Sequence, residues 1–227
     1  MGAGVADADG VISRDLFARD EGESARCDLA PGAVLLRGFA LTAEAELKHA
    51  VAAVAASAPF RNMKTPGGFT MSVAMTNCGR LGWVSSERGY RYAEQDPERG
   101  APWPAMPAAM LDLARGAAAA AGFKGFEPDA CLVNRYEPGA RLTLHQDKDE
   151  RDFAHPIVSV SLGVPAVFLF GGLKRKDRPA RLSLVHGDVV VFGGPSRLRY
   201  HGVAPLKEAQ HSFAGQARIN LTLRRAS

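Results

Sequence analysis

The chain has 227 residues, of which 46% are apolar and 23% are charged, and a net charge of +4. This length favours one domain with a substantial hydrophobic core. No run of about 18 apolar residues could span a membrane, and residues 1–10 lack the basic start and apolar stretch of a secretory signal. The 3 cysteines are scattered without a Cys-x-x-Cys pair. This argues against a disulfide framework or a thiolate zinc site, and fits the reducing cytoplasm.

Two segments before residue 130 lack clear helical or strand periodicity. Residues 1–28 are rich in Ala, Gly, Asp and Glu and predict a loose N-terminal leader, which leaves 29–227 as the folded domain. Residues 59–104 hold Gly, Pro, Thr, Asn and aromatic residues between two predicted helices. Because a connection of this length usually has a function or covers a site, we expect it to form a lid.

One strand and two helices are predicted beside these segments. Residues 33–39 have the apolar composition of a strand. Thr42 precedes two glutamates and is expected to cap a helix that continues to about Ser57. Pro107 suits the first position of a second helix, which we expect to stop before Gly122.

From residue 130 the pattern changes to short apolar segments separated by Gly and Pro. Such strands are typical of a sandwich or jelly roll rather than a parallel α/β sheet. We therefore predict a mainly β fold with flanking helices, an α+β arrangement whose jelly-roll core covers 130–225. The predicted strands are 131–137, 141–147, 157–162, 166–170, 181–185, 188–192, 197–204 and 217–224.

His145 and Asp147 form a His-x-Asp pair in one predicted strand. Alternate side chains of a strand share one face, about 6–7 Å apart, so both could reach one ion. Of the histidines downstream, His201 is favoured as third ligand because it follows a strand-like run and lies far enough along the chain to return on a neighbouring strand. Two imidazoles and one carboxylate favour non-haem Fe(II) used for oxygen chemistry. The alternatives are a zinc hydrolase site, or a surface His beside a turn Asp.

The last predicted strand places Arg218, Asn220 and Arg224 on one face, with apolar residues on the other. A buried charge without a partner is costly, and the guanidinium group matches a carboxylate. A small dicarboxylic acid inside a barrel would satisfy both arginines. Asn134 and Tyr136 share one face of an earlier predicted strand and would complete that pocket. The alternative is an outer edge strand whose arginines are solvated.

A cluster of five basic residues precedes and enters the predicted strand 181–185, opposed only by Asp177. Such a cluster suits contact with phosphate groups, and a solvated loop is an equally weighted alternative. Its members are Lys174, Arg175, Lys176, Arg178 and Arg181.

Several of these residues belong to longer motifs that occur together between about residue 30 and residue 225. The motifs are Thr65-Pro-Gly-Gly-Phe-Thr-Met-Ser-Val-Ala-Met-Thr-Asn-Cys-Gly, Trp103-Pro-Ala-Met-Pro, Asn134-Arg-Tyr, His145-Gln-Asp147-Lys-Asp149, His201-Gly and Arg218-Ile-Asn220-Leu-Thr-Leu-Arg224. In this combination the chain resembles the AlkB family of Fe(II)/2-oxoglutarate dioxygenases, most of all its bacterial founding members.

The resemblance implies a double-stranded β-helix in which residues 59–104 are a nucleotide-recognition lid. It implies that iron is bound by His145, Asp147 and His201, with O2 as the oxidant. The carboxylates of 2-oxoglutarate would be held by Arg218 and Arg224, with help from Asn134, Tyr136 and Asn220. The substrate would be contacted by Trp83, Tyr90, Asp149 and Arg175.

The resemblance also implies the reaction, which is oxidative demethylation of N-alkylated bases in single- or double-stranded DNA, and in RNA as a second substrate. The methyl group of 1-methyladenine or 3-methylcytosine would leave as formaldehyde, while 2-oxoglutarate becomes succinate and CO2. Both lesions are cationic, so Asp149 is a suitable partner. We expect a cytoplasmic monomer. The chain departs from the family at Phe192, where some relatives have Trp, and in its leader, which has no counterpart.

Two other functions are compatible with these residues. A 2-oxoglutarate-dependent hydroxylase of a small molecule or protein would keep the metal ligands and the arginines, but would need neither Trp83 nor the basic cluster. A nucleic-acid-binding module with a structural metal would need no oxygen chemistry. Release of formaldehyde from methylated oligonucleotides separates all three functions.

Overall fold

The structure is a computed structural model that describes residues 25–227, so most of the predicted leader lies outside the described residues. The last residues of that leader, 26–28, belong instead to β1 (Arg26–Ala30), which pairs antiparallel with β2 (Ala33–Leu36). The folded domain therefore includes residues that precede its predicted start at residue 29.

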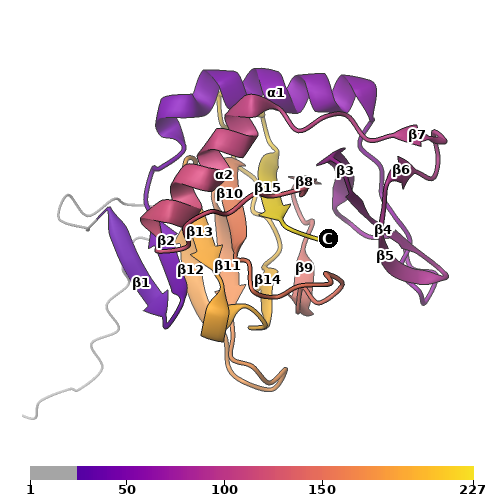
Figure 1. Cartoon of the computed structure of the whole chain (residues 1–227). Helices are drawn as coiled ribbons and strands as arrows, with labels where there is room; N and C mark the ends of the chain where they lie inside the picture. The colour runs from indigo at the N-terminus through magenta and orange to yellow at the C-terminus, as the bar shows by residue number, and fades with distance from the viewer. Residues whose placement is uncertain (1–24) are drawn as a thin grey trace, which may run out of the picture.

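Two antiparallel sheets form the body of the protein (Figure 1). The larger sheet has the strand order β1-β2-β13-β10-β15-β8-β3, and the smaller one has the order β12-β11-β14-β9. Neighbouring strands are thus often far apart in sequence, and the predicted mainly β fold is confirmed. The larger sheet also contains β3 (Ala74–Gly79), β8 (Ala130–Tyr136), β10 (Ile157–Gly163), β13 (Val189–Phe192) and β15 (Arg218–Arg224). The smaller sheet contains β9 (Leu142–His145), β11 (Ala166–Phe170), β12 (Ala180–Leu184) and β14 (His201–Val203).

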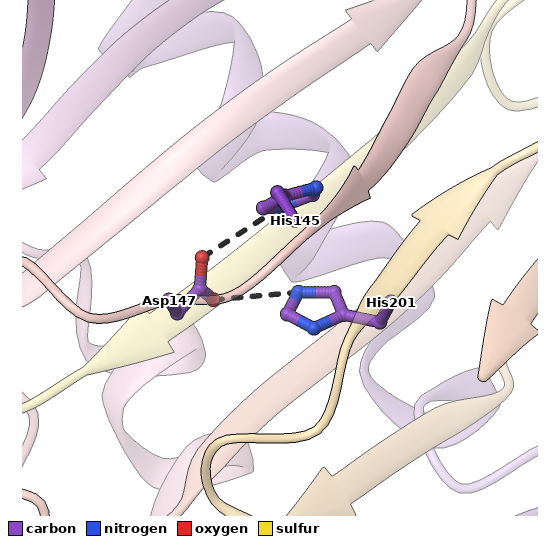
Figure 2. Close-up of side chains that lie close together, drawn as sticks. All are labelled: His145, Asp147 and His201. Atoms are coloured by element: carbon purple, nitrogen blue, oxygen red, sulfur yellow. Dashed lines mark ion pairs between the residues drawn. The ribbon is translucent and has the colours of Figure 1, made fainter. Parts of the chain in front are cut away.

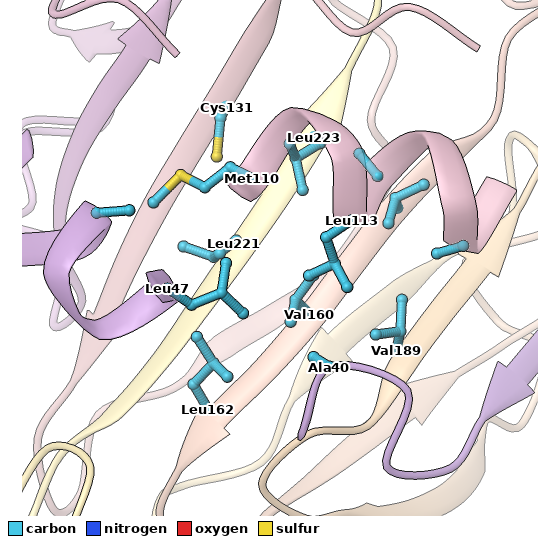
Figure 3. Packing of buried hydrophobic residues seen from close by; sticks show 14 of the residues in the cluster. Ala40, Leu47, Met110, Leu113, Cys131, Val160, Leu162, Val189, Leu221 and Leu223 are labelled. Carbon is cyan, nitrogen blue, oxygen red and sulfur yellow. The ribbon is translucent and has the colours of Figure 1, made fainter. Parts of the chain in front are cut away.

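The larger sheet is covered on both faces, because side chains that alternate along each strand enter two different layers. On β15, Leu221 and Leu223 belong to the cluster that packs against the helices, as Figure 3 shows. On the facing side, Phe192 of the larger sheet and Phe168 of the smaller sheet share a second cluster. Arg218 is on this inner side of β15, so the parity of the strand places polar residues between the sheets.

Helices α1 (Glu44–Ser57) and α2 (Ala108–Ala120) pack on the outer face of the larger sheet (Figure 1). The buried residues of α1, which include Leu47, Val51 and Val54, recur at the spacing of one helical face. Two glutamates in the first turn of α1 favour its N-terminus through the helix dipole.

The predicted helix starts are wrong in detail. Thr42 does not cap α1, because a 3-10 turn, η1 (Leu41–Ala43), comes first and Ala43 is the N-cap, without a side-chain hydrogen bond. Pro107 is the N-cap of α2 rather than its first helical residue. The predicted stop before Gly122 is confirmed, since this glycine has a φ of 97° that ends the helix.

Three predicted strands are shorter than expected. The first ends at Leu36. Two residues later, Gly38 adopts a φ of 62° and its N–H donates to Asp188 Oδ1. The strand predicted at 141–147 ends at His145, so Asp147 lies in the following loop. Of 197–204 only β14 is a strand, and it follows the 3-10 turn η2 (Gly194–Ser196). Arg197 is held there by hydrogen bonds of its side chain to backbone carbonyls, not by a sheet ladder.

Residues 59–104 contribute β3 to the larger sheet and otherwise form two small hairpins beside it (Figure 1). These hairpins pair β4 (Gly82–Ser86) with β5 (Gly89–Ala93), and β6 (Gln95–Asp96) with β7 (Ala101–Pro102). The Asn77 side chain fixes the first hairpin by exchanging two hydrogen bonds of 3.0 Å with the backbone of Trp83. In the described part of the chain, no helix is long and apolar enough to cross a membrane.

Candidate active site

A cavity of about 420 Å³ lies between the two sheets and under the β4–β5 hairpin. Its walls come from strands of both sheets, from the loop after β9 and from the hairpin. All twelve predicted site residues line it: Trp83, Tyr90, Asn134, Tyr136, His145, Asp147, Asp149, Arg175, His201, Arg218, Asn220 and Arg224. The fold thus brings together residues that are up to 141 positions apart in the sequence.

Three of these residues face one another within the cavity, as Figure 2 shows. His145 at the end of β9 and His201 at the start of β14 are paired across neighbouring strands, which brings their rings to a centroid distance of 4.5 Å. Asp147 Oδ1 lies 3.7 Å from His145 Nε2, and Asp147 Oδ2 lies 3.6 Å from His201 Nε2. No other group of three His, Cys, Asp or Glu side chains within residues 25–227 offers ligand atoms this close, all within 4.8 Å of one another.

The histidine rings are oriented by the backbone. His145 Nδ1 lies 2.8 Å from the carbonyl oxygen of Thr143, and His201 Nδ1 lies 3.0 Å from that of Arg199. Because a carbonyl only accepts, each Nδ1 carries the proton and each Nε2 presents its lone pair toward Asp147. This second hydrogen bond of the imidazole is the usual way in which metal-binding histidines are held.

The charge states of His145 and Asp147 also suit a divalent cation. Burial, followed by the charge of His201, lowers the pKa of His145 to about 4. Burial would raise the pKa of Asp147, but the positive charge of Arg224 and the interactions with His201 and His145 together outweigh it and hold that pKa well below its ordinary value. At neutral pH His145 is therefore neutral and Asp147 is ionised, as a metal ligand must be. The donor set of two imidazoles and one carboxylate fits non-haem Fe(II).

Arg218 is a buried guanidinium with donors left over. It is 1% exposed, and its centre lies 5.0 Å from the ring of Tyr136. Its Nη2 donates to Ser161 Oγ at 2.9 Å, but its Nε and Nη1 are buried without a hydrogen-bond partner. Burial lowers the pKa of Arg218. Unpaired buried donors are costly, so this end of the cavity fits the carboxylate of a ligand.

Arg224, the second arginine predicted to hold a ligand carboxylate, lines the same cavity and also pairs with a carboxylate of the protein. Its Nη2 donates to Asp147 Oδ2 at 2.6 Å and its Nε to the same oxygen at 3.0 Å. Burial would lower the pKa of Arg224, but its interactions with Asp147, Tyr92 and Glu150 together outweigh burial and raise it. Since Asp147 follows the end of β9 instead of lying within it, its carboxylate can meet Arg224 directly. The alternation of side chains along a strand therefore could not reveal that Asp147 is the partner of Arg224.

A chain of amides and hydroxyls connects the remaining polar residues of the inner wall. Asn220 donates from Nδ2 to Ser159 Oγ at 2.9 Å and accepts from Asn134 Nδ2 at 3.2 Å. Asn134 Oδ1 remains buried without a partner, and burial raises the pKa of Tyr136 to about 12. Two neutral side chains therefore offer further polar contacts beside Arg218.

The outer part of the cavity carries the predicted substrate residues. Trp83 donates from Nε1 to Asp149 Oδ2 at 2.8 Å, which connects the hairpin to the loop after β9. One face of its indole ring stacks on Tyr90, with ring centroids 5.4 Å apart and planes inclined by 17°. Arg175 also lines the cavity, with its guanidinium carbon 5.9 Å from the ring centroid of Tyr200. An aromatic ring, a carboxylate and a cation thus surround the entrance.

Three residues near the site were missed by the sequence prediction. Glu150, Arg197 and Tyr92 form a buried polar group with Arg224. Phe192 places its ring 5.1 Å from that of His201, edge to face, so it packs against a predicted ligand where some relatives have Trp. The only sequence feature that pointed to the group formed by Glu150, Arg197 and Tyr92 was the position of Glu150 at the end of the run Asp-Lys-Asp-Glu.

Comparisons with known proteins agree with this geometry. The profile of the 2OG-Fe(II) oxygenase superfamily matches residues 32–224. The alpha-ketoglutarate-dependent dioxygenase AlkB of Salmonella typhimurium is 59% identical over 199 residues, which cover 88% of this chain and 92% of that protein. The protein of the same name from Escherichia coli is 58% identical over 212 residues, which cover 93% and 97%. The chain belongs to the AlkB family. The solved structure of OsALKBH1 is a further match, with a TM-score of 0.78 and 29% identity, covering 88% of this chain and 99% of that one.

Membership in the AlkB family makes the protein a dioxygenase that uses Fe(II), O2 and 2-oxoglutarate. The site agrees with these cofactors on two structural grounds. The histidine Nε2 atoms and the Asp147 carboxylate converge, and a guanidinium with unsatisfied donors lies in the same cavity.

Proposed function

We propose that this AlkB-family protein repairs alkylated nucleic acid directly, by oxidative demethylation of 1-methyladenine and 3-methylcytosine in single- or double-stranded DNA, with RNA as a second substrate. The observation that carries the proposal is the content of one cavity. It joins a His-Asp-His cluster, a buried arginine with two free donors, and a Trp–Asp pair between the hairpin and the loop after β9.

In this proposal His145, Asp147 and His201 bind Fe(II), and Arg218 and Arg224 hold the carboxylates of 2-oxoglutarate. When bound, iron couples the oxidative decarboxylation of 2-oxoglutarate by O2 to hydroxylation of the N-methyl group, which then leaves as formaldehyde. The polar side chains of Asn134, Tyr136 and Asn220 assist on the inner wall.

The protein residues around the metal position the reactants and exclude solvent. Thr143 and Arg199 hold the histidine rings through their carbonyl groups, so the Nε2 atoms stay aimed at one point. The apolar side chains of Ile157, Phe168 and Phe192 line the same cavity. A dry, preorganised wall strengthens the electrostatic contacts in the site and protects reactive species from water.

A base in a duplex cannot reach this cavity, so it has to be flipped out or already unpaired. Methylation at the Watson–Crick edge lowers the cost of flipping because it prevents normal pairing. We propose that Trp83 stacks on the extruded base, that Asp149 faces its positive charge, and that Tyr90 and Arg175 contact the flanking strand. Tyr90 is 48% exposed and Arg175 is exposed, which leaves both available to a large ligand.

The alternative of a small-molecule or protein hydroxylase is not favoured by relatives at 58–59% identity. It would also leave the basic cluster without a role. The members of this cluster are all exposed: Lys174, Arg175, Lys176, Arg178 and Arg181. We further propose that 59–104 acts as the nucleotide-recognition lid on a 130–225 core, and that the enzyme works as a cytoplasmic monomer.

The deciding experiment measures formaldehyde release from a panel of oligonucleotides. DNA and RNA, single- and double-stranded, would each carry 1-methyladenine, 3-methylcytosine or a larger N-alkyl adduct. We expect release that needs both Fe(II) and 2-oxoglutarate, with unmethylated strands as the control. Turnover of 2-oxoglutarate to succinate without any formaldehyde from these substrates would contradict the proposed substrate class but leave the oxygenase chemistry standing.

A further inference from the structure

Glu150 is a buried carboxylate that the proposed reaction does not use. Its side chain is 1% exposed, and its Oε2 lies 3.2 Å from Arg197 Nη2. Its Oε1 lies 3.4 Å from Arg224 Nε and accepts a hydrogen bond of 2.8 Å from the Tyr92 hydroxyl. The contact to Arg197 is an ion pair without the alignment of a hydrogen bond, since Oε2 has no hydrogen-bond partner. A carboxylate is buried at such a place only with compensating charges.

The two arginines that compensate Glu150 also contact Asp147. Arg224 donates twice to Asp147 Oδ2, at 2.6 and 3.0 Å. Arg197 donates from Nη1 to the backbone carbonyl oxygen of Asp147 at 2.8 Å. A change at Glu150 therefore reaches both the side chain and the backbone of Asp147.

Arg224 and a metal ion would use the same oxygen atom. Asp147 Oδ2 accepts from Arg224 and also lies 3.6 Å from His201 Nε2, on the side where the ligand atoms converge. In the present arrangement Asp147 and Glu150 together balance the charges of Arg197 and Arg224. If Glu150 were neutral, Arg224 would have one ionised partner fewer, and its positive charge beside Asp147 would be less compensated and would oppose a bound cation more strongly.

Tyr92 extends this group of charges into the lid. It lies on β5, directly opposite Trp83 in the hairpin, and its hydroxyl donates to Glu150. The same hydroxyl is 3.4 Å from Arg224 Nη1. Glu150 lies in the same loop as Asp147. Its buried side chain contacts Tyr92 of the hairpin that carries Trp83, and Arg224 of β15.

We infer that Glu150 is a positioning residue, which shares Arg224 with Asp147 and, through Tyr92, fixes the lid hairpin to the metal centre. The inference rests on the proposed role of Asp147 as a metal ligand. It gives Glu150 two separable effects. The charge of Glu150 keeps Asp147 available to the metal, and its hydrogen bond from Tyr92 holds the hairpin in place.

The first effect is tested by titrating the purified full-length chain with Mn²⁺ and measuring free Mn²⁺ by electron paramagnetic resonance. We expect Glu150→Gln, which retains an acceptor for Tyr92, to weaken Mn²⁺ binding about tenfold, in the range found for residues that support metal ligands. Glu98→Gln removes the same charge from an exposed carboxylate, 68% accessible, and should bind Mn²⁺ like the parent protein. Equal affinities of the two variants would overturn the inference.

The variant Asp147→Ala tests the proposed metal site independently of the role of Glu150. If this variant binds Mn²⁺ as tightly as the parent, the metal centre itself is wrongly placed. If Asp147→Ala loses binding and Glu150→Gln does not, only the role of Glu150 is wrong. Should Glu150→Gln fail to fold, Glu150→Asp keeps the charge but withdraws it from Arg224, and the same loss of affinity is expected.

The second effect is tested with Tyr92→Phe, which leaves every charge in place. We expect its Mn²⁺ affinity to stay within about twofold of the parent, because the charge balance around Arg224 is kept. Trypsin cleavage after Arg88 or Arg91 in the hairpin should become several-fold faster, as followed by mass spectrometry. Unchanged cleavage in that segment would refute the connection between Glu150 and the lid.

Discussion

The inner end of the cavity and the hairpin above it are built in different ways. At the inner end, His145, His201 and Arg218 lie on strands of two packed sheets, and their orientations are set by hydrogen bonds or by close packing. The hairpin reaches the body of the protein mainly through individual side chains, such as Asn77, Asp149 and Glu150. The difference indicates that the predicted metal ligands are supported by packed strands, whereas the residues proposed to meet the base lie on an element that can adjust.

The largest expected effect lies at the inner end. Asp147→Ala should abolish formaldehyde release, because it removes one of three ligands and frees Arg224 to repel the cation. Asp152→Ala is a matched control, since Asp152 is 48% exposed and does not line the cavity; it accepts a hydrogen bond from the Ala154 N–H and lies 3.6 Å from His155. Assays with saturating Fe(II) and 2-oxoglutarate would compare the two. If Asp147→Ala were as active as Asp152→Ala, Asp147 would not be needed at the metal site. The inner end of the cavity would then not be the region that supports the reaction.

The second effect concerns the co-substrate. Arg218→Met should raise the KM for 2-oxoglutarate by about 10- to 100-fold or abolish turnover, as the loss of charge-assisted hydrogen bonds predicts. Arg135→Met is the control on the neighbouring strand, because Arg135 pairs with Ile219 but points outward to Glu137. An unchanged requirement for 2-oxoglutarate in the Arg218 variant would show that its free donors have another partner.

The third effect distinguishes the two tryptophans of the chain. Trp83→Ala should raise the KM for a methylated oligonucleotide by about 5- to 150-fold and alter kcat little, since base stacking contributes about 1–3 kcal/mol. Trp103 is 5% exposed and packs on Gly82, so Trp103→Ala should instead lower the free energy of unfolding by about 3–5 kcal/mol. Steady-state kinetics and denaturant titration separate the outcomes. Normal kinetics of Trp83→Ala would exclude the stacking role.

The smallest effect is one of pH. The pKa of His145 is lowered to about 4 in the folded protein, whereas an unfolded histidine takes up its proton near pH 6.5. Its contribution to the stability of the metal-free protein is therefore complete above about pH 6.5 and is lost as the pH falls toward 4. His145→Gln should show a flatter decline of the unfolding free energy across this window. Because His186 also has a lowered pKa, the difference between the two proteins is the quantity to measure.

The sequence was most informative where a strand is covered on both faces. The alternation of β15 predicts that Arg218 and Asn220 lie on the inner face, and both line the cavity. His201, favoured over His186 and His211, lies beside His145 and Asp147, whereas the other two stack on each other with centroids 4.4 Å apart. Periodicity and spacing are sufficient in such cases, since packing on both sides leaves one orientation.

Partners outside a regular strand could not be predicted in this way. Asp147 lies beyond the end of β9, so its ion pair with Arg224 depends on the path of a loop. Glu150 and Arg197 meet across 47 positions, from two irregular segments. Thr42 was a reasonable N-cap by residue type, but the 3-10 turn at Leu41–Ala43 starts the helix differently. Tertiary contacts decide the conformation of these short segments, and no local pattern encodes them.

The hydrogen bond between Trp83 and Asp149 has a consequence for discrimination between damaged and normal bases. Since Asp149 Oδ2 already accepts the indole N–H, a base that contacts this oxygen must share it with an existing donor. A cationic lesion competes for it with a stronger, charge-assisted contact, whereas an undamaged adenine or cytosine offers only a neutral one. Rejection of normal nucleotides would then begin at the lid, before any base comes near the oxidising centre.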